Sequence, residues 1–305
     1  MQCTPIKGPS RPSLRFFFLS TFLLMAPVAL TAQFPVEDPA DACSLSHLKD
    51  AARVGDYLFR TYEDKATGER CFQVFHGGKV IFRRTNDNGG WFTIGQPARK
   101  EDNVPAIPNG TDVTGRGRPN MIVAAYTGGA HCCSVHYVFE LEPEFKLLET
   151  LNDQDDDVAH FEKVGNKYLY KTTDWTFAYW PSCFACSPSE PVLLQFEENG
   201  NVNGFHLALD KMQKPAPTEE EWNAQLIAAR KVVHDQDVGS VGRTLWSTVL
   251  DLIYSGHSDV QGGQFADIGL EAFCMVLKSS PYWADLEPTL HDTPPTCANA
   301  KPRRK

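Results

Sequence analysis

Four cysteines stand in two close pairs, a spacing that can bind a metal ion or exchange electrons. Cys132 and Cys133 are adjacent in the stretch YTGGAHCC, and Cys183 and Cys186 form a C-x-x-C pair in the stretch WPSCFACS. Thiol pairs of this kind bind zinc, take part in redox exchange or close a local disulfide. Together with His131 or His136, either of which can replace one thiolate, they make a ligand set that is chemically adequate for zinc.

Strand geometry and the number of cysteines favour disulfides at these positions. Adjacent residues of a strand point to opposite faces, so Cys132 and Cys133 face one metal ion only where the chain turns or bulges. Nine cysteines less Cys3, which lies in the N-terminal apolar segment, leave eight. An even number is typical of disulfide-bonded exported proteins. The natural local pairs are Cys43 with Cys71 and Cys274 with Cys297.

A second candidate site is the acidic stretch NDQDDD. It places Asp153, Asp155 and Asp157 at alternate positions, which is a spacing that can wrap carboxylates around a hard cation such as calcium. The stretch lacks the glycine and the late acidic ligand of known calcium loops. We therefore favour the alternative, a solvated acidic turn, because like charges spread into water.

A third candidate is the loop that begins the segment DVTGRGRPNMIVAAYTGG. It has Asp112 in the first place, Thr114 in the third, Arg116 in the fifth, Gly117 at the turn and Asn120 in the ninth. This pattern resembles the FG-GAP or VCBS-type repeat of integrin-like propellers, in which a cation loop precedes an apolar strand. The chain thus resembles bacterial exported proteins that carry a single degenerate element of this kind.

The charge of this loop argues against calcium. Calcium takes six to eight oxygen ligands, and a guanidinium at the fifth place has the wrong sign of charge. We expect Arg116 to form an ion pair with Asp112 that holds the turn in place of a cation. No cofactor is expected, with calcium or zinc as the alternatives; the candidate metal ligands are Asp112, Asp153, Asp155, Asp157, His131, Cys183 and Cys186.

Signatures of common hydrolases and nucleotide-binding proteins do not occur. The sequence contains no G-x-S-x-G, no H-E-x-x-H and no phosphate-binding glycine loop. His160, Glu162, Asp174 and Asp210 could act as acid and base, but nothing in the sequence places them together. We therefore expect no catalytic residues. The alternative is an envelope thiol- or metal-dependent enzyme centred on His131, Cys132, Cys133, Cys183 and Cys186.

Residues 33–209 have the pattern of a β domain. Short apolar runs such as CFQVFHGGKVIFR are separated by turn residues, which is typical of antiparallel hairpins. Gly128 and Gly129 predict a further turn or bulge with positive φ. Turn signals recur about every ten residues, as in sandwiches and propellers. The predicted fold is α+β, mainly antiparallel β, as a propeller-like or irregular meander of about three four-strand groups.

A C-terminal helical extension should follow the β domain. Residues 210–217 have the composition of a linker, and Thr218 stands three residues before Glu221, the spacing of a capping box. Apolar residues then recur at helical intervals, which predicts three helices within residues 218–290 with Trp246, Tyr282 and Trp283 as packing residues. Residues 291–305 form a tail.

The N-terminal 1–32 segment has the pattern of a signal peptide, with basic residues before the apolar run FFFLSTFLLM and the small residue Ala32 at its end. Without it, 29 basic and 38 acidic residues become 26 and 38, a net charge of −12. This charge disfavours nucleic acid as a partner, and no later apolar run is long enough for a membrane span. The leading hypothesis is a secreted or periplasmic, disulfide-stabilised binding protein without catalysis, whose ligand is an unknown protein or small molecule.

Overall fold

The computed structural model describes residue 43 and residues 47–86, 89–129, 133–180, 183–200, 202–234, 242–258 and 270–290. All of them belong to one compact unit, Ala40–Lys305. The predicted signal peptide, the predicted tail, His131, Cys132 and Cys297 lie outside the described residues.

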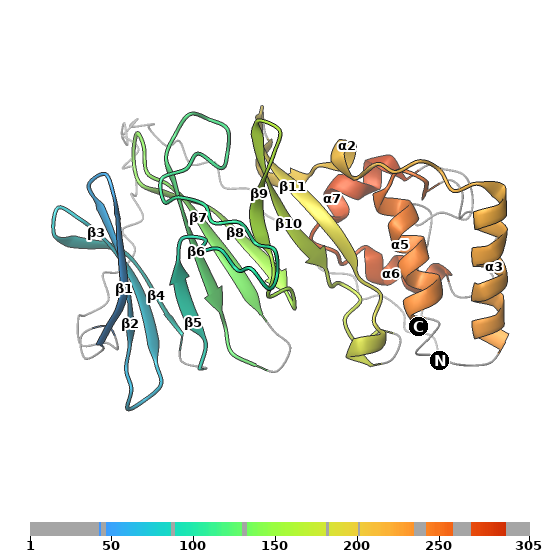
Figure 1. Ribbon diagram of the computed structural model, residues 1–305, viewed down its shortest axis with the longest axis horizontal. Helices are drawn as coiled ribbons and strands as arrows, with labels where there is room; N and C mark the ends of the chain where they lie inside the picture. The colour runs from blue at the N-terminus through green and yellow to red at the C-terminus, as the bar shows by residue number, and fades with distance from the viewer. Residues whose placement is uncertain are drawn as a thin grey trace, which may run out of the picture. The chain divides into compact units, whose positions relative to one another are not determined.

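The described residues form three antiparallel sheets of four strands each (Figure 1). In every sheet the strands neighbour one another in chain order, so each sheet is a meander. The predicted α+β, mainly antiparallel β fold with three four-strand groups is therefore confirmed. The first sheet contains β1 (His47–Val54), β2 (Tyr57–Glu63), β3 (Arg70–His76) and β4 (Lys79–Asn86), the second β5 (Trp91–Ile94), β6 (Asn120–Tyr126), β7 (Ser134–Glu140) and β8 (Lys146–Gln154), and the third β9 (His160–Val164), β10 (Lys167–Asp174), β11 (Glu190–Asn199) and β12 (Val202–Leu207).

The hairpin between β3 and β4 shows how the local sequence sets the turns. His76 pairs with Lys79, and the two residues between them, Gly77 and Gly78, have φ values of 56° and 78°. A two-residue turn with two positive φ angles matches the twist of the strands and is readily adopted by glycine. The predicted turn at Gly128 and Gly129 also has positive φ at both residues.

The second sheet is buried on both faces. Along β6, Met121 and Val123 belong to one apolar cluster, which contains residues of the first sheet, and Ile122 belongs to another, which contains residues of the third. Phe139 and Val138 of β7 divide in the same way. This double burial explains why the stretch NMIVAAY is continuously apolar instead of alternating with polar residues.

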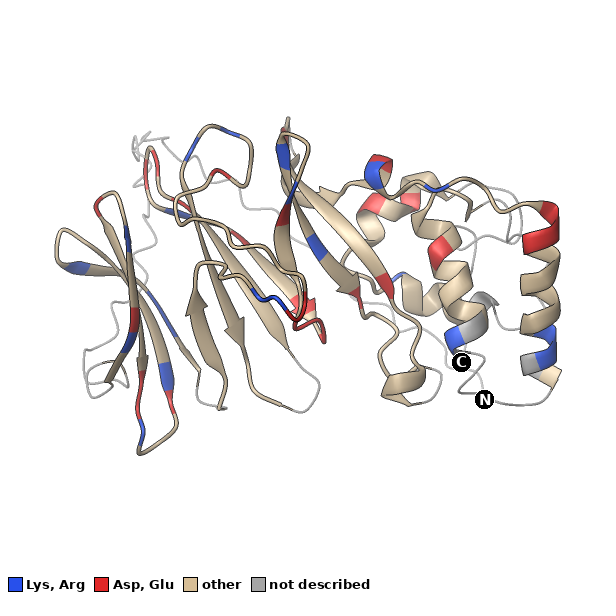
Figure 2. Ribbon diagram, in the orientation of Figure 1, with Lys and Arg blue, Asp and Glu red and all other residues tan. Residues whose placement is uncertain are grey.

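Helices follow the third sheet (Figure 1). The predicted capping box is present, since the Thr218 N–H donates to Glu221 Oε2 at 2.8 Å and the Glu221 N–H donates to Thr218 Oγ1 at 3.3 Å. Acidic residues occupy the first turn of α3 and basic residues its last turn, which favours the helix dipole (Figure 2). The helical segments are α2 (Leu209–Met212), which begins the predicted linker, α3 (Glu219–His234), the π-helical turn η2 (Gly242–Trp246), α5 (Ser247–Tyr254), α6 (Leu270–Leu277), α7 (Trp283–Leu286) and the short 3-10 turns η1 (Phe184–Cys186) and η5 (Glu287–Thr289).

Aromatic stacking joins these helices to the third sheet. Phe273 of α6 stacks on Phe177 and on Trp246, with ring centroids 4.7 Å and 4.8 Å apart. Trp246 is buried, and Tyr282 and Trp283 pack against the same cluster, as predicted. None of the helices described here is long and apolar enough to cross a membrane.

Two disulfides join pairs of described residues. Cys43 is bonded to Cys71, as predicted. Cys183 is bonded to Cys186, so this C-x-x-C pair forms the local disulfide that was one of the three alternatives for it. Cys133 and Cys274 are also disulfide-bonded. The predicted pairing of Cys274 with Cys297 involves a residue outside the described part of the chain.

Replacing Cys43 and Cys71 together by serine is expected to lower the free energy of unfolding by about 3 kcal/mol. The bond links residues 28 positions apart and therefore removes much conformational entropy from the unfolded chain. The matched control, Cys183→Ser with Cys186→Ser, opens a bond between residues only three positions apart and should cost less. Urea unfolding followed by circular dichroism measures both; equal losses would contradict the argument.

Candidate functional site

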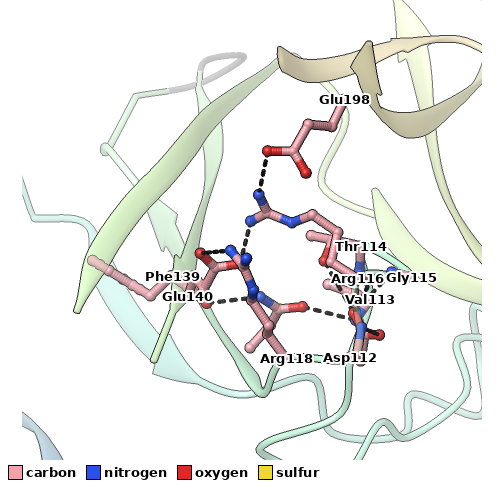
Figure 3. Close-up of polar contacts among 11 residues, drawn as sticks. Asp112, Val113, Thr114, Gly115, Arg116, Arg118, Phe139, Glu140 and Glu198 are labelled. Carbon is pink, nitrogen blue, oxygen red and sulfur yellow. Dashed lines mark hydrogen bonds and ion pairs between the residues drawn. The ribbon is translucent and has the colours of Figure 1, made fainter. Parts of the chain in front are cut away.

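The FG-GAP-like loop is held by its own backbone. The Asp112 carboxylate accepts N–H groups from Gly115 at 2.8 Å and from Gly117 at 2.6 Å, and two further N–H groups of the loop reach Oδ1 (Figure 3). Asn120, in the ninth place, accepts the N–H of Val113 at 2.9 Å. The side-chain oxygens of Asp112 and Asn120 are thus engaged by the protein.

The expected ion pair between Arg116 and Asp112 is wrong. The Arg116 guanidinium instead donates to Glu140 at the end of β7, and it also lies 3.3 Å from Glu198 of β11 (Figure 3). The guanidinium carbon of Arg116 is 4.6 Å from the ring centroid of Phe196. The physical reason is that Glu140 is buried and requires a counter-charge, whereas Asp112 is already satisfied by N–H groups. Arg116 therefore links the second sheet to the third.

The acidic stretch does not form one cation loop. Asp153 is the penultimate residue of β8 and is 1% exposed, so the solvated turn that we favoured is wrong for this residue. Gln154 has a φ of 54° and ends the strand, after which Asp155 is half-buried and Asp157 exposed. In the part of the chain that the structure describes, no three His, Cys, Asp or Glu side chains are grouped so as to hold a metal ion.

The thiols of the enzyme hypothesis are oxidised where they are described. Cys183 and Cys186 are bonded to each other, and Cys133 is disulfide-bonded as well. Cys133 also closes the β6–β7 hairpin, because its N–H donates to Thr127 Oγ1 at 2.9 Å and its carbonyl accepts the N–H of Thr127. These three cysteines stabilise turns and offer no free thiolate for zinc or nucleophilic chemistry.

A buried hydrogen-bonded group lies between the second and third sheets. His136 Nδ1 is 2.7 Å from Asp153 Oδ2, and the Tyr170 hydroxyl donates to Asp153 Oδ1 at 2.5 Å. Burial and the nearby Asp153 charge raise the pKa of Tyr170 well above its ordinary value, so the phenol remains a donor. Nδ1 also lies 2.7 Å from the Tyr170 hydroxyl, so the three side chains form one hydrogen-bonded group.

His136 lines a cavity of about 280 Å³ on the second sheet. Nε2 has no hydrogen-bond partner among the described residues. At this cavity Trp91 of β5 is 53% exposed and stacks on Tyr126 of β6 with ring centroids 4.4 Å apart. Polar residues Thr93, Gln96, Arg99, Ser134 and Asp157 complete its lining together with small apolar residues.

A second cleft of about 310 Å³ lies between the third sheet and helices α2 and α5. Glu190, at the start of β11, is buried there, and burial, together with the neighbouring charge of Asp251, raises the pKa of its carboxyl to about 8. Lys214 is 4.0 Å from Glu190 and forms an ion pair with Asp251. The cleft therefore holds a carboxyl group that stays protonated at neutral pH.

The four acid–base candidates of the sequence do not assemble into one site. His160 and Glu162 lie on β9 with Nε2 and Oε2 3.7 Å apart. Asp174 is fully buried and accepts hydrogen bonds from Tyr254 and Ser280, at 2.6 Å and 2.9 Å, so it ties the helices to β10. The remaining candidate, the exposed Asp210, pairs with the adjacent lysine of α2.

Sequence reasoning considered two of these residues in other roles, His136 as a replacement ligand for zinc and Asp153 in a cation loop or a solvated acidic turn. It passed over Tyr170, Trp91 and Glu190. The signal for His136 was a titratable side chain inside the apolar run SVHYVFE, since a buried imidazole requires a partner. Glu190 had no such signal, because its burial depends on helices that follow it in the chain by more than twenty residues.

Substituting Arg116 by methionine is expected to lower the free energy of unfolding by about 3 kcal/mol, since it leaves the buried Glu140 with a single partner. The control is Arg118→Met, because Arg118 contacts the same carboxylate but its side chain is 42% exposed; its loss should stay below about 1 kcal/mol. Adding Glu140→Gln to Arg116→Met should restore part of the stability. Equal losses from the two arginine variants would disprove a special role for Arg116.

The raised pKa of Glu190 predicts a pH dependence of stability. The unfolded chain releases this proton near pH 4.5 and the folded chain near pH 8, so the folded state binds more protons between these values. The contribution of Glu190 to the free energy of unfolding should therefore fall as the pH rises from about 4.5 to 8 and then level off. Glu190→Gln keeps an amide donor toward Asp251, so its urea-unfolding profile should decline less with pH than that of the wild type. Parallel profiles would contradict the assignment.

Comparisons with protein-family models, with curated proteins and with solved structures gave no match to this chain. The likeness of the loop at residues 112–120 to an FG-GAP repeat accordingly stays a prediction. The geometry of the two cavities and the buried polar groups is the basis on which a function can be assigned.

Proposed function

We propose that this protein is exported and binds a small hydroxyl-bearing ring compound, such as a saccharide, in the cavity beside Trp91. Catalysis is not part of the proposal. The observation that carries it is a solvent-exposed indole ring, stacked on Tyr126, at a cavity that is also lined by an imidazole whose Nε2 has no hydrogen-bond partner among the described residues.

The aromatic pair supplies a flat apolar platform. A tryptophan on the surface marks a binding site more often than other surface residues do, because its large ring loses contact with water on binding. Stacking on Tyr126 fixes the ring of Trp91, which lowers the entropy lost when a ligand is bound. Asn86 further anchors this position by donating to the carbonyl of Tyr126 at 2.7 Å.

The polar side of the cavity suits hydroxyl groups. The imidazole of His136 and the hydroxyl groups of Ser134 and Thr93 can each form hydrogen bonds with a ligand hydroxyl. Asp153 and Tyr170 hold the imidazole from behind, so its orientation is set before a ligand arrives. A cavity of about 280 Å³ is close to the lower end of the range for small-molecule sites, which fits one ring and excludes a large cofactor.

Two features support export. The N-terminal segment has the pattern of a signal peptide, and the described cysteines that form disulfides are typical of oxidising compartments. The cysteines then act as structural bonds in the proposal, and the loop at Asp112 acts as a support that joins two sheets without a cation.

Titration of the oxidised protein with a panel of monosaccharides and disaccharides, followed by tryptophan fluorescence and calorimetry, tests the proposal. At least one sugar should bind, and Trp91→Ala should weaken that binding at least about tenfold, because stacking contributes strongly at such sites. His136→Ala should also weaken it. The matched control is Tyr179→Ala, which removes another exposed aromatic side chain away from the cavity and should bind as the wild type does.

Either of two results would sink the proposal. One is that no sugar of the panel binds at millimolar concentration. The other is that Trp91→Ala binds as tightly as Tyr179→Ala, since the ligand would then occupy a different place. Circular dichroism of each variant separates a loss of binding from a loss of folding.

A further inference from the structure

The outer face of the first sheet carries two arginines side by side. Arg53 of β1 lies opposite Leu58 of β2, and Arg60 follows Leu58 by two residues. Residues two apart on a strand share a face, so the two guanidinium groups are diagonal neighbours on one face. It is the face opposite to Phe59, whose ring is buried in the apolar cluster between the first and second sheets.

Neither arginine has an acidic partner within the described ranges. Arg53 forms no ion pair or hydrogen bond there, and the one contact of the Arg60 guanidinium is the ring of Phe75, 5.1 Å away. The Nε atom of Arg60 is buried and without a hydrogen-bond partner. By contrast, Arg70 of the same sheet lies 2.6 Å from Glu63. The charges of both guanidinium groups thus have no counter-charge within the described ranges, and an oxyanion in the groove would supply one.

These side chains line a groove of about 440 Å³. Leu58 and Phe75 form an apolar floor, and His76 with the glycine turn at residues 77–78 closes one end. Asp56 also lines the groove, at the turn between β1 and β2, and is the single carboxylate against two guanidinium groups. The guanidinium carbon of Arg60 lies 5.1 Å from the ring centroid of Phe75, and a guanidinium group can bind two oxygens of one anion at once.

The first sheet also differs in charge from the chain as a whole. Residues 47–86 contain eight lysines and arginines against five acidic residues, a balance of +3, whereas the complete chain has 29 against 38. Figure 2 shows basic residues along the strands of this sheet. Local positive charge in an acidic protein attracts anions to this sheet in preference to the rest of the chain.

We infer that this groove is a binding site for a small oxyanion, a phosphate or a multiply charged carboxylate, clamped between Arg53 and Arg60. The inference is independent of the cavity at Trp91, because the residues of the two sites do not overlap. Phosphate and carboxylate groups share the geometry that a guanidinium pair recognises. Leu58 and Phe75 would contact any apolar part of the molecule that carries the anion.

Titration of the oxidised protein with inorganic phosphate and with citrate at low ionic strength, followed by calorimetry, tests this site. Arg53→Gln and Arg60→Gln should each weaken binding about tenfold, since each removes charge-assisted hydrogen bonds. The matched control is Arg84→Gln, because Arg84 is exposed on the opposite face of the same sheet, paired with the core residue Phe72. It should bind as the wild type does.

The outcomes distinguish a phosphorylated ligand from a polycarboxylate, and a specific site from a diffuse electrostatic attraction. Tighter binding of phosphate than of citrate would identify a phosphorylated ligand, and the reverse a polycarboxylate. Binding of neither anion below about 10 mM, or an equal loss from Arg84→Gln, would overturn the site, because only a diffuse attraction would then remain. Arg53→Gln changes an exposed residue and keeps the test valid if Arg60→Gln does not fold. Trp91→Ala should leave anion binding unchanged, so failure here is separate from failure of sugar binding.

Discussion

Burial of the second sheet on both faces is the constraint on which the rest of the structure depends. Its strands present alternate residues to two apolar clusters, one shared with the first sheet and one shared with the third sheet and the helices. A polar side chain buried in such a sheet is stable only where it finds a partner. The buried polar residues of β7 and β8, His136, Glu140 and Asp153, are therefore the positions at which the structure is most specific.

Each of these buried polar groups forms a hydrogen bond or an ion pair with a residue of a neighbouring sheet or loop. Glu140 is matched by Arg116, which in turn contacts β11, while Asp153 is matched by Tyr170 of β10. Apolar packing alone is tolerant of sliding, but hydrogen bonds between fixed donors and acceptors are directional. The contacts of the second sheet with the third thus have a defined register, and the imidazole at the Trp91 cavity is held by the same contacts.

Local sequence predicted much of the fold. The glycine turn at 77–78, the capping box at Thr218 and the three groups of strands follow from short-range patterns and are confirmed. The register of β4 was not predictable, because a shift between Val74 and Phe75 makes Ile81 an extra residue and leaves Val80 44% exposed. The site residues were harder still: the contact of His136 with Tyr170 joins strands 34 residues apart, and spacing within one strand contains no information about it.

The meander connectivity has a consequence for how the chain acquires its structure. Every sheet consists of consecutive strands, so each can close from a continuous segment without waiting for a distant partner, which keeps loop closure cheap. A chain that emerges from its N-terminal end can therefore complete the first and second sheets early. The third sheet differs, because one of its faces is covered by helices that are made last. Until α5 and α6 are synthesised, that face is an exposed apolar surface. At this stage the nascent protein most needs protection from aggregation.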